Sequence, residues 1–165
     1  WYAYNNLGNI LSSNKQTIQK GLDYYEKAIE IAAGNGDSQN ALTPVVNIAW
    51  THLENHNFSE ASPYLKKAWN LSKEKEDKGL QSNLLILYGM YHAGKQEYIE
   101  SREHFRQAIE MAEKDTMLVE ASFAYEEFSK MLVASGQFEE GYSALAKHQE
   151  YREELFQKEK NHNNK

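Results

Sequence analysis

The stretch Tyr88–Ala108, YGMYHAGKQEYIESREHFRQA, decides the fold, because it joins two amphipathic segments across a short polar turn. The first segment carries a large and a small residue, Tyr88-Gly89, and the second carries a large-small-large series, Tyr98, Ser101 and Phe105. The apolar positions of both segments are three or four residues apart, as one face of an α-helix requires. The stretch therefore predicts two helices packed as an antiparallel hairpin.

The same pattern recurs along the chain with a period of 40 residues, which is the spacing of Ala28, Ala68 and Ala108. A small residue at the crossing lets two helix backbones approach, while large neighbours fill the grooves beside it. The large-small pairs are Leu7-Gly8, Ile48-Ala49, Tyr88-Gly89 and Phe128-Ser129. The columns of the second helices are Ile18, Phe58, Tyr98 and Phe138; Gly21, Ala61, Ser101 and Gly141; and Tyr25, Leu65, Phe105 and Leu145. Four hairpin units are predicted.

The predicted fold is all-α, since helix-forming residues are plentiful and only 2 Pro interrupt the chain. We expect one domain over residues 1–160 and a frayed polar tail over 161–165. Its units cover about residues 1–34, 35–75, 76–114 and 115–158. The helices are expected near residues 2–13, 17–33, 38–55, 58–75, 78–94, 97–113, 117–134 and 137–158.

Two prolines predict local bends, because Pro44 and Pro63 would each remove a helical hydrogen bond. An alternative at the first is that Thr43 is an N-cap and Pro44 the first helical residue, so that the helix starts later.

Composition and charge narrow the classes of function. The chain of 165 residues has a net charge of −6, so it lacks the basic surface that nucleic-acid binding requires. The sequence contains no apolar run of about 18 residues, so it predicts no membrane span. The absence of cysteine excludes disulfides, thiolate metal sites and a cysteine nucleophile. Because the sequence starts at Trp1, we expect it to be part of a longer protein.

The column pattern resembles the tetratricopeptide repeat in its longer, 40-residue form, from Tyr4 to about Tyr151. The best-matching stretches are Leu7-Gly8 with Tyr25–Ala28, Tyr88-Gly89 with Phe105–Ala108, and Gly136–Gly141. The resemblance implies a right-handed superhelical solenoid of four antiparallel helix-turn-helix repeats. In this family the first helix of each repeat lines an inner groove that holds a protein or peptide segment.

The terminal segment, Tyr142–Leu145 followed by Leu155–Glu159, resembles the segment that closes the repeat domain in certain bacterial envelope sensor kinases and helix-turn-helix regulators. His148 and Glu153 depart from the aromatic residue and the Asp of that pattern. The resemblance implies the sensory or partner-binding region of a two-component signal-transduction protein, which would be periplasmic. The alternative is a free-standing cytoplasmic adaptor or a peptide-sensing transcriptional regulator. Self-association through the terminal helix is a further expectation.

Seven side chains are candidates to line the groove, because they recur at one spacing on the first helices, one step round from the core face. They are Asn5, Asn9, Asn47, Trp50, Asn83, Met90 and Lys130. A primary amide both donates and accepts, so the asparagines suit a peptide backbone, and the tryptophan and methionine would add apolar pockets. A structural interpretation is equally open, in which the asparagines are solvated and the two apolar side chains pack against an adjoining hairpin.

Some members of the family clamp a peptide carboxylate with three cations and two asparagines. The corresponding positions here are Asn5, Asn9, Asn47, Asn83 and Leu87. Asn9 and Asn47 match the two asparagines of the clamp. Asn5, Asn83 and Leu87 stand where the three cations would be, so charge-assisted capture of a carboxylate is not expected.

Metal binding and catalysis have little support in the sequence. His52 and His56 lie one helical turn apart, but Glu54 between them fits neither zinc-protease order, and no further ligand is suitably spaced. His52 recurs as His92 in a column that is aromatic in the family, which favours packing. No phosphate loop or Ser/His/Asp arrangement occurs, so we expect no enzyme, no metal and no cofactor.

Overall fold

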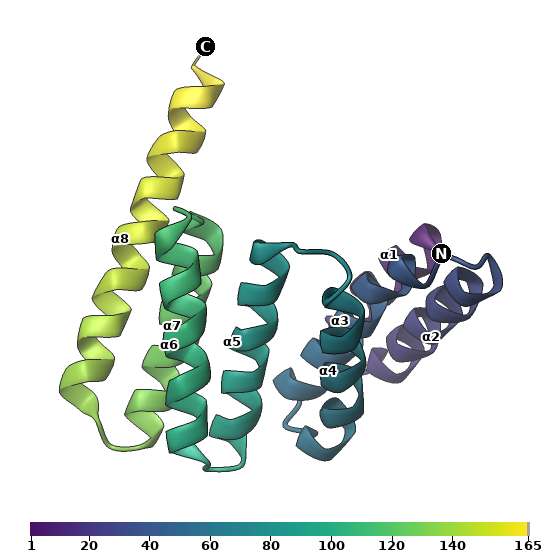
Figure 1. Ribbon diagram of the computed structural model, residues 1–165, viewed down its shortest axis with the longest axis horizontal. Helices are drawn as coiled ribbons and strands as arrows, with labels where there is room; N and C mark the ends of the chain where they lie inside the picture. The colour runs from purple at the N-terminus through teal and green to yellow at the C-terminus, as the bar shows by residue number, and fades with distance from the viewer. Residues whose placement is uncertain (165) are drawn as a thin grey trace. The chain divides into compact units, whose positions relative to one another are not determined.

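The computed structural model describes residues 1–164, and over that range it contains helices and turns but no strand. The chain forms two compact units, unit 1 from Trp1 to Glu76 and unit 2 from Asp77 onward. Each unit consists of two antiparallel helical hairpins (Figure 1). The predicted all-α architecture of four hairpins is confirmed. None of the described helices is long and apolar enough to cross a membrane.

Unit 1 pairs α1 with α2 and α3 with α4. Its elements are α1 (Tyr2–Ser12), α2 (Ile18–Gly34), the 3-10 helix η1 (Ser38–Ala41), α3 (Leu42–Glu54) and α4 (Phe58–Ser72). The first helices of the two hairpins, α1 and α3, contact each other. Side chains of these two helices are therefore brought together on one face of the unit.

Unit 2 pairs α5 with α6 and α7 with α8. Its helices are α5 (Lys78–Gly94), α6 (Tyr98–Lys114), α7 (Leu118–Ala134) and α8 (Phe138–Asn163). Here too the first helices, α5 and α7, contact each other. The 26 residues of α8 extend about 39 Å at 1.5 Å per residue, and Figure 1 shows α8 running beyond α6 and α7.

All the turns of residues 1–164 except the one between α1 and α2 contain a residue with a positive φ, and these residues recur every 20 positions. Six residues among those described have a positive φ, between 44° and 83°. They are Gly36, His56, Glu76, Gln96, Thr116 and Gly136. At all but Glu76, the next residue's N–H donates to a carbonyl five residues earlier, as Glu97 N does to His92 O at 2.8 Å. This is the Schellman arrangement, which satisfies the last carbonyls of a helix.

Small and large residues interlock at the hairpin crossings as predicted. A Cβ on Gly8 would lie 2.5 Å from the ring of Tyr25, and one on Gly89 would lie 2.8 Å from the ring of Phe105. Both distances are shorter than van der Waals contact, so each glycine provides the space that the ring occupies. The three alanines of the 40-residue column are fully buried beside them.

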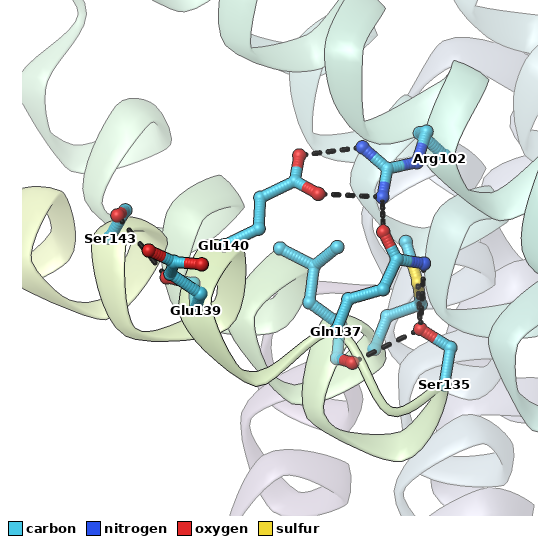
Figure 2. Close-up of polar contacts among 8 residues, drawn as sticks. Arg102, Ser135, Gln137, Glu139, Glu140 and Ser143 are labelled. Atoms are coloured by element: carbon cyan, nitrogen blue, oxygen red, sulfur yellow. Dashed lines mark hydrogen bonds and ion pairs between the residues drawn. The ribbon is translucent and has the colours of Figure 1, made fainter.

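An ion pair joins the second helices of unit 2, α6 and α8. The Arg102 guanidinium donates to both carboxylate oxygens of Glu140, at 2.6 and 2.8 Å, and also to the Gln137 amide oxygen (Figure 2). The hydrogen bond from Arg102 lowers the pKa of the Glu140 carboxyl. The bidentate geometry fixes the direction in which the two helices pack.

Tyrosine–glutamate hydrogen bonds join second helices in both units. Tyr64 of α4 donates to Glu26 of α2 in unit 1, and Tyr151 of α8 donates to Glu113 of α6 at 2.6 Å in unit 2. Both pairs are 38 residues apart in sequence, as are Arg102 and Glu140. Successive hairpins of a unit are therefore linked by polar contacts at a regular spacing.

Pro44 lies in the first turn of α3, and Pro63 lies inside α4. The helix expected to start at residue 38 starts at Leu42, because residues 38–41 form η1. Pro44 is therefore the third residue of α3, where its missing N–H removes no intrahelical hydrogen bond, and Thr43 is not the N-cap. Helix α4 runs through Pro63 without interruption. The bend at Pro63 stays a prediction.

The last helix is longer than expected, because α8 ends at Asn163 and not near residue 158. Beyond Glu150 it is rich in Glu, Lys, Arg and Gln and has no Gly or Pro, so nothing in the sequence ends it earlier. The predicted polar tail is thus helical up to Asn163, and Lys165 lies outside the described residues. The single domain over residues 1–160 stays a prediction.

Candidate functional site

Three asparagines on α1 and α3 form a hydrogen-bonded cluster in unit 1, which we call the amide cluster. The Nδ2 of Asn47 donates to Asn5 Oδ1 at 3.1 Å and to Asn9 Oδ1 at 3.2 Å. Asn5 is 4% exposed, Asn47 is half-buried and Asn9 is exposed. The amide cluster therefore runs from a buried end at Asn5 to a solvent-facing end at Asn9.

Tyr25 of α2 holds the solvent-facing end of the amide cluster in place. Its hydroxyl donates to Asn9 Oδ1 at 2.8 Å and lies 3.1 Å from Ser12 Oγ. Burial raises the pKa of the Tyr25 phenol, so the hydroxyl remains a donor at neutral pH. Because Asn9 Oδ1 accepts two hydrogen bonds, its N–H groups are the atoms left for a ligand. Among residues 1–164, neither these N–H groups nor Asn47 Oδ1 has a hydrogen-bond partner.

The amide cluster opens into a pocket of about 540 Å³ formed by α1, the turn after it, α2 and α3. Trp50 and Ile18 contribute apolar surface to the pocket. Lys15 and Glu54 contribute one charge of each sign. Asn9 and Asn47 line it as well, so two residues of the amide cluster belong to the same pocket as Trp50.

This combination of groups suits the binding of a peptide segment. Free amide N–H and C=O groups match the donors and acceptors of a peptide backbone, and an aromatic wall accepts an apolar side chain. Three of the four unit 1 candidates, Asn9, Asn47 and Trp50, line the pocket. Asn5 does not line it and instead accepts a hydrogen bond from Asn47.

The three unit 2 candidates lie on first helices but form no amide cluster. Asn83 and Met90 are half-buried on α5, and Lys130 of α7 is exposed. The Lys130 ammonium donates to Glu127 at 3.0 Å and lies 3.9 Å from Glu126.

The residues that replace the amide cluster in unit 2 differ in kind from one first helix to the next. In the 40-residue columns, α5 has apolar residues and α7 has charged residues at these positions. They are Ile86, Leu87 and Met90 in α5, and Glu126, Glu127 and Lys130 in α7. Among the described residues, the amide cluster is therefore confined to unit 1.

Two models of the tetratricopeptide repeat family match the sequence, one over residues 2–74 and the other over residues 82–115. Together they cover more than half of the chain. This chain belongs to the tetratricopeptide repeat family. Tetratricopeptide repeats are protein–protein interaction modules, so the role of this repeat protein is to bind other proteins. No curated protein matches the sequence.

The hairpin α7–α8 lies outside both matched ranges, but it packs as the other repeats do. Phe128 of α7 lies on Phe105 of α6, with ring centroids 5.5 Å apart. His148 of α8 continues the column of Ala28, Ala68 and Ala108, and it is 6% exposed. Its Nδ1 lies 2.8 Å from the carbonyl oxygen of Ser122 and 3.0 Å from the Ser122 hydroxyl. A polar partner on α7 therefore accommodates this departure from the repeat.

The histidine column of this repeat protein takes part in packing. The His52 ring lies 6.0 Å from that of Tyr64, and the His92 ring lies 5.0 Å from that of His104. Burial lowers the pKa of His52, which favours a neutral ring. His56 lies in a turn with φ of 60°. Over residues 1–164, no group of three or more His, Asp or Glu side chains is placed to hold a metal ion.

Sequence reasoning missed the part that Tyr25 plays in the site, because it assigned Tyr25 to the packing column of Leu65, Phe105 and Leu145. Tyr25 alone in that column has a hydroxyl group. That difference is a usable signal, since a buried hydroxyl requires a polar partner and Asn9 lies on the adjacent helix.

Proposed function

We propose that unit 1 of this repeat protein binds an extended segment of a partner protein or peptide in the pocket beside the amide cluster. The observation that carries the proposal is the pair Asn9 and Asn47, whose free amide groups are held in one orientation by intrachain hydrogen bonds. Groups that are already fixed lose little conformational entropy on binding, so more of their hydrogen-bond energy becomes affinity.

The proposed ligand is a backbone segment that carries one apolar or aromatic side chain. That side chain would lie against Trp50 and Ile18, while the backbone pairs with Asn9 and Asn47. The protein then acts by binding alone, with no catalytic step, metal or cofactor.

We further propose that this binding serves signal transduction, with the chain as the sensory or partner-binding region of a bacterial two-component protein. The support is the sequence resemblance of residues 142–145 and 155–159, together with the continuous helix α8 that extends to Asn163. In a sensor kinase this region would be periplasmic. Hydrogen–deuterium exchange tests the role, because ligand binding should change amide protection in α8 as well as in α1 and α3.

The pocket is tested by selecting linear peptides from a random displayed library on the immobilised protein, and then measuring the affinity of each for variants. Asn9→Ala removes free donors that face the pocket and should weaken binding about 3- to 10-fold, the value of one hydrogen bond. Trp50→Ala should weaken it about 10-fold or more, because it removes the apolar wall.

The matched control is Asn6→Ala, which removes an exposed amide from the same helix but outside the pocket lining. Its affinity should equal that of the wild type, and circular dichroism should show that all three variants remain folded. Selected peptides whose affinity is the same for Asn9→Ala, Trp50→Ala and Asn6→Ala would place binding elsewhere and refute the pocket.

A further inference from the structure

Two apolar faces of the chain are exposed although the equivalent positions of other hairpins are buried or half-buried. On α8, Phe138, Tyr142 and Leu145 are 67%, 75% and 40% exposed, and we call them the α8 face. On α1, Leu7 and Ile10 are 40% and 68% exposed, and we call them the α1 face. Exposed apolar side chains that gather on one face of a helix mark a surface that binds another protein chain.

The 40-residue columns show what covers the α8 face elsewhere in the chain. Leu145 occupies the column of Tyr25 and Phe105, which are 2% and 1% exposed. In unit 2 the first helix of the next hairpin covers Phe105, because Phe128 of α7 lies on it with ring centroids 5.5 Å apart. In unit 1, Tyr25 lines the same pocket as Thr51 of α3, which is again the first helix of the next hairpin.

The same columns show what the α1 face would cover. Leu7 and Ile10 occupy the columns of Phe128 and Met131, which are 7% and 2% exposed in α7. The α1 face is therefore the counterpart of the α7 surface that packs on Phe105. The chain carries both halves of a packing arrangement that it already makes within unit 2.

We propose that copies of this chain associate head to tail, with the α1 face of one copy docked on the α8 face of the next. Leu7 and Ile10 of one copy would contact Leu145 of the other, as Phe128 lies on Phe105 within unit 2. The occupant of both faces is thus a second copy. The contact is heterologous, so it builds a ring or an open chain of copies.

The polar residues beside these faces are compatible with the contact. Within unit 2, Arg102 of α6 pairs with Glu140 of α8 beside the apolar contact. At the proposed contact, Tyr142 of one copy takes the column position of Arg102, and Lys20 of the other copy takes that of Glu140. An ammonium beside a phenol ring is attractive, so no charge repulsion opposes docking.

Sedimentation velocity over a range of concentrations tests the proposal with two charge variants of the full 165-residue chain. The wild type should form species larger than a dimer as concentration rises. Leu7→Glu and Leu145→Glu should each be monomeric, since each loses one of the two faces. An equimolar mixture should form a dimer and nothing larger, because each variant keeps the face that the other has lost.

The control is Ile99→Glu, which changes an apolar residue that is 84% exposed on α6 and belongs to neither face. It should associate like the wild type. If Leu145→Glu does not fold, Tyr142→Lys takes its place, because its ammonium would lie beside Lys20 of the other copy and repel it. A wild type that is monomeric at every concentration overturns the proposal. Association of Leu7→Glu alone also overturns it, because that result indicates symmetric pairing through α8.

Discussion

Replacing Gly89 with alanine tests the close approach of α5 and α6 that the repeat pattern implies. The added Cβ would lie 2.8 Å from Cε2 and Cζ of Phe105, whereas carbon atoms at their optimal separation are about 3.5–4.0 Å apart. The ring has little room to move, because Phe105 is 1% exposed and lies against Phe128. The substitution therefore forces a shift of packed side chains or of the helix backbone.

The magnitude follows from two opposing contributions. Overpacking a core by one methyl group costs about 1–3 kcal/mol. Replacing glycine with alanine inside a helix stabilises the helix by about 1 kcal/mol. We therefore expect Gly89→Ala to lower the free energy of unfolding by about 1 kcal/mol, with about 2 kcal/mol as the upper value. Gly34→Ala is the matched control, since a Cβ there meets nothing within 4 Å at the end of α2.

Urea unfolding followed by circular dichroism measures both variants. Gly34→Ala should equal or exceed the wild type in stability, and Gly89→Ala should fall below it. Adding Phe105→Leu to Gly89→Ala should cost less than Phe105→Leu costs alone, because the smaller side chain makes room for the methyl group. A Gly89→Ala protein as stable as Gly34→Ala would refute the reasoning about close helix approach.

Three further predictions concern the turns and the polar contacts between helices. Thr116→Gly should raise the free energy of unfolding by about 0.5–1 kcal/mol, because a β-branched residue is strained at φ of 54°; an unchanged or lower urea midpoint would contradict this. Burial raises the pKa of Tyr64 from 10.0 to about 12, so its contribution to stability is complete below pH 10 and is lost as pH rises towards 12. Tyr64→Phe should therefore lose less stability than the wild type in urea titrations at high pH. The same pH dependence in both proteins would contradict this role of Tyr64. Arg102→Lys should lower stability by up to about 1 kcal/mol, since lysine cannot make the bidentate contact with Glu140, and the difference should shrink in high salt.

The hairpins could be predicted from the sequence because their signals are local. The 40-residue columns that contain Gly89 and Phe105 report packing within one hairpin, and turn clusters mark where each helix ends. Exposure could not be predicted in the same way, since Phe105 and Leu145 share a column but are 1% and 40% exposed, and Phe128 of α7 covers only Phe105. The start of α3 at Leu42 was missed because η1 and a helix have similar sequence requirements.

The site could be predicted only in part. Helical spacing placed Asn5, Asn9 and Asn47 on one face, and the structure brings them together. The pairing of their amides depends on side-chain rotamers and on the distance between α1 and α3, which spacing does not report. The same is true of Tyr25, whose hydroxyl reaches Asn9 from a different helix.

Site-specific photocrosslinking in the source cell tests the central claim most directly, namely that a partner segment binds in the pocket of unit 1. A photoreactive phenylalanine analogue would replace Ser13, an exposed residue of the pocket lining, and Ile99 on α6 would serve as the control position. We predict that one partner segment crosslinks from position 13, does not crosslink from position 99, and is lost when Asn9→Ala is added. A partner that crosslinks from position 99 and never from position 13 would contradict the proposal.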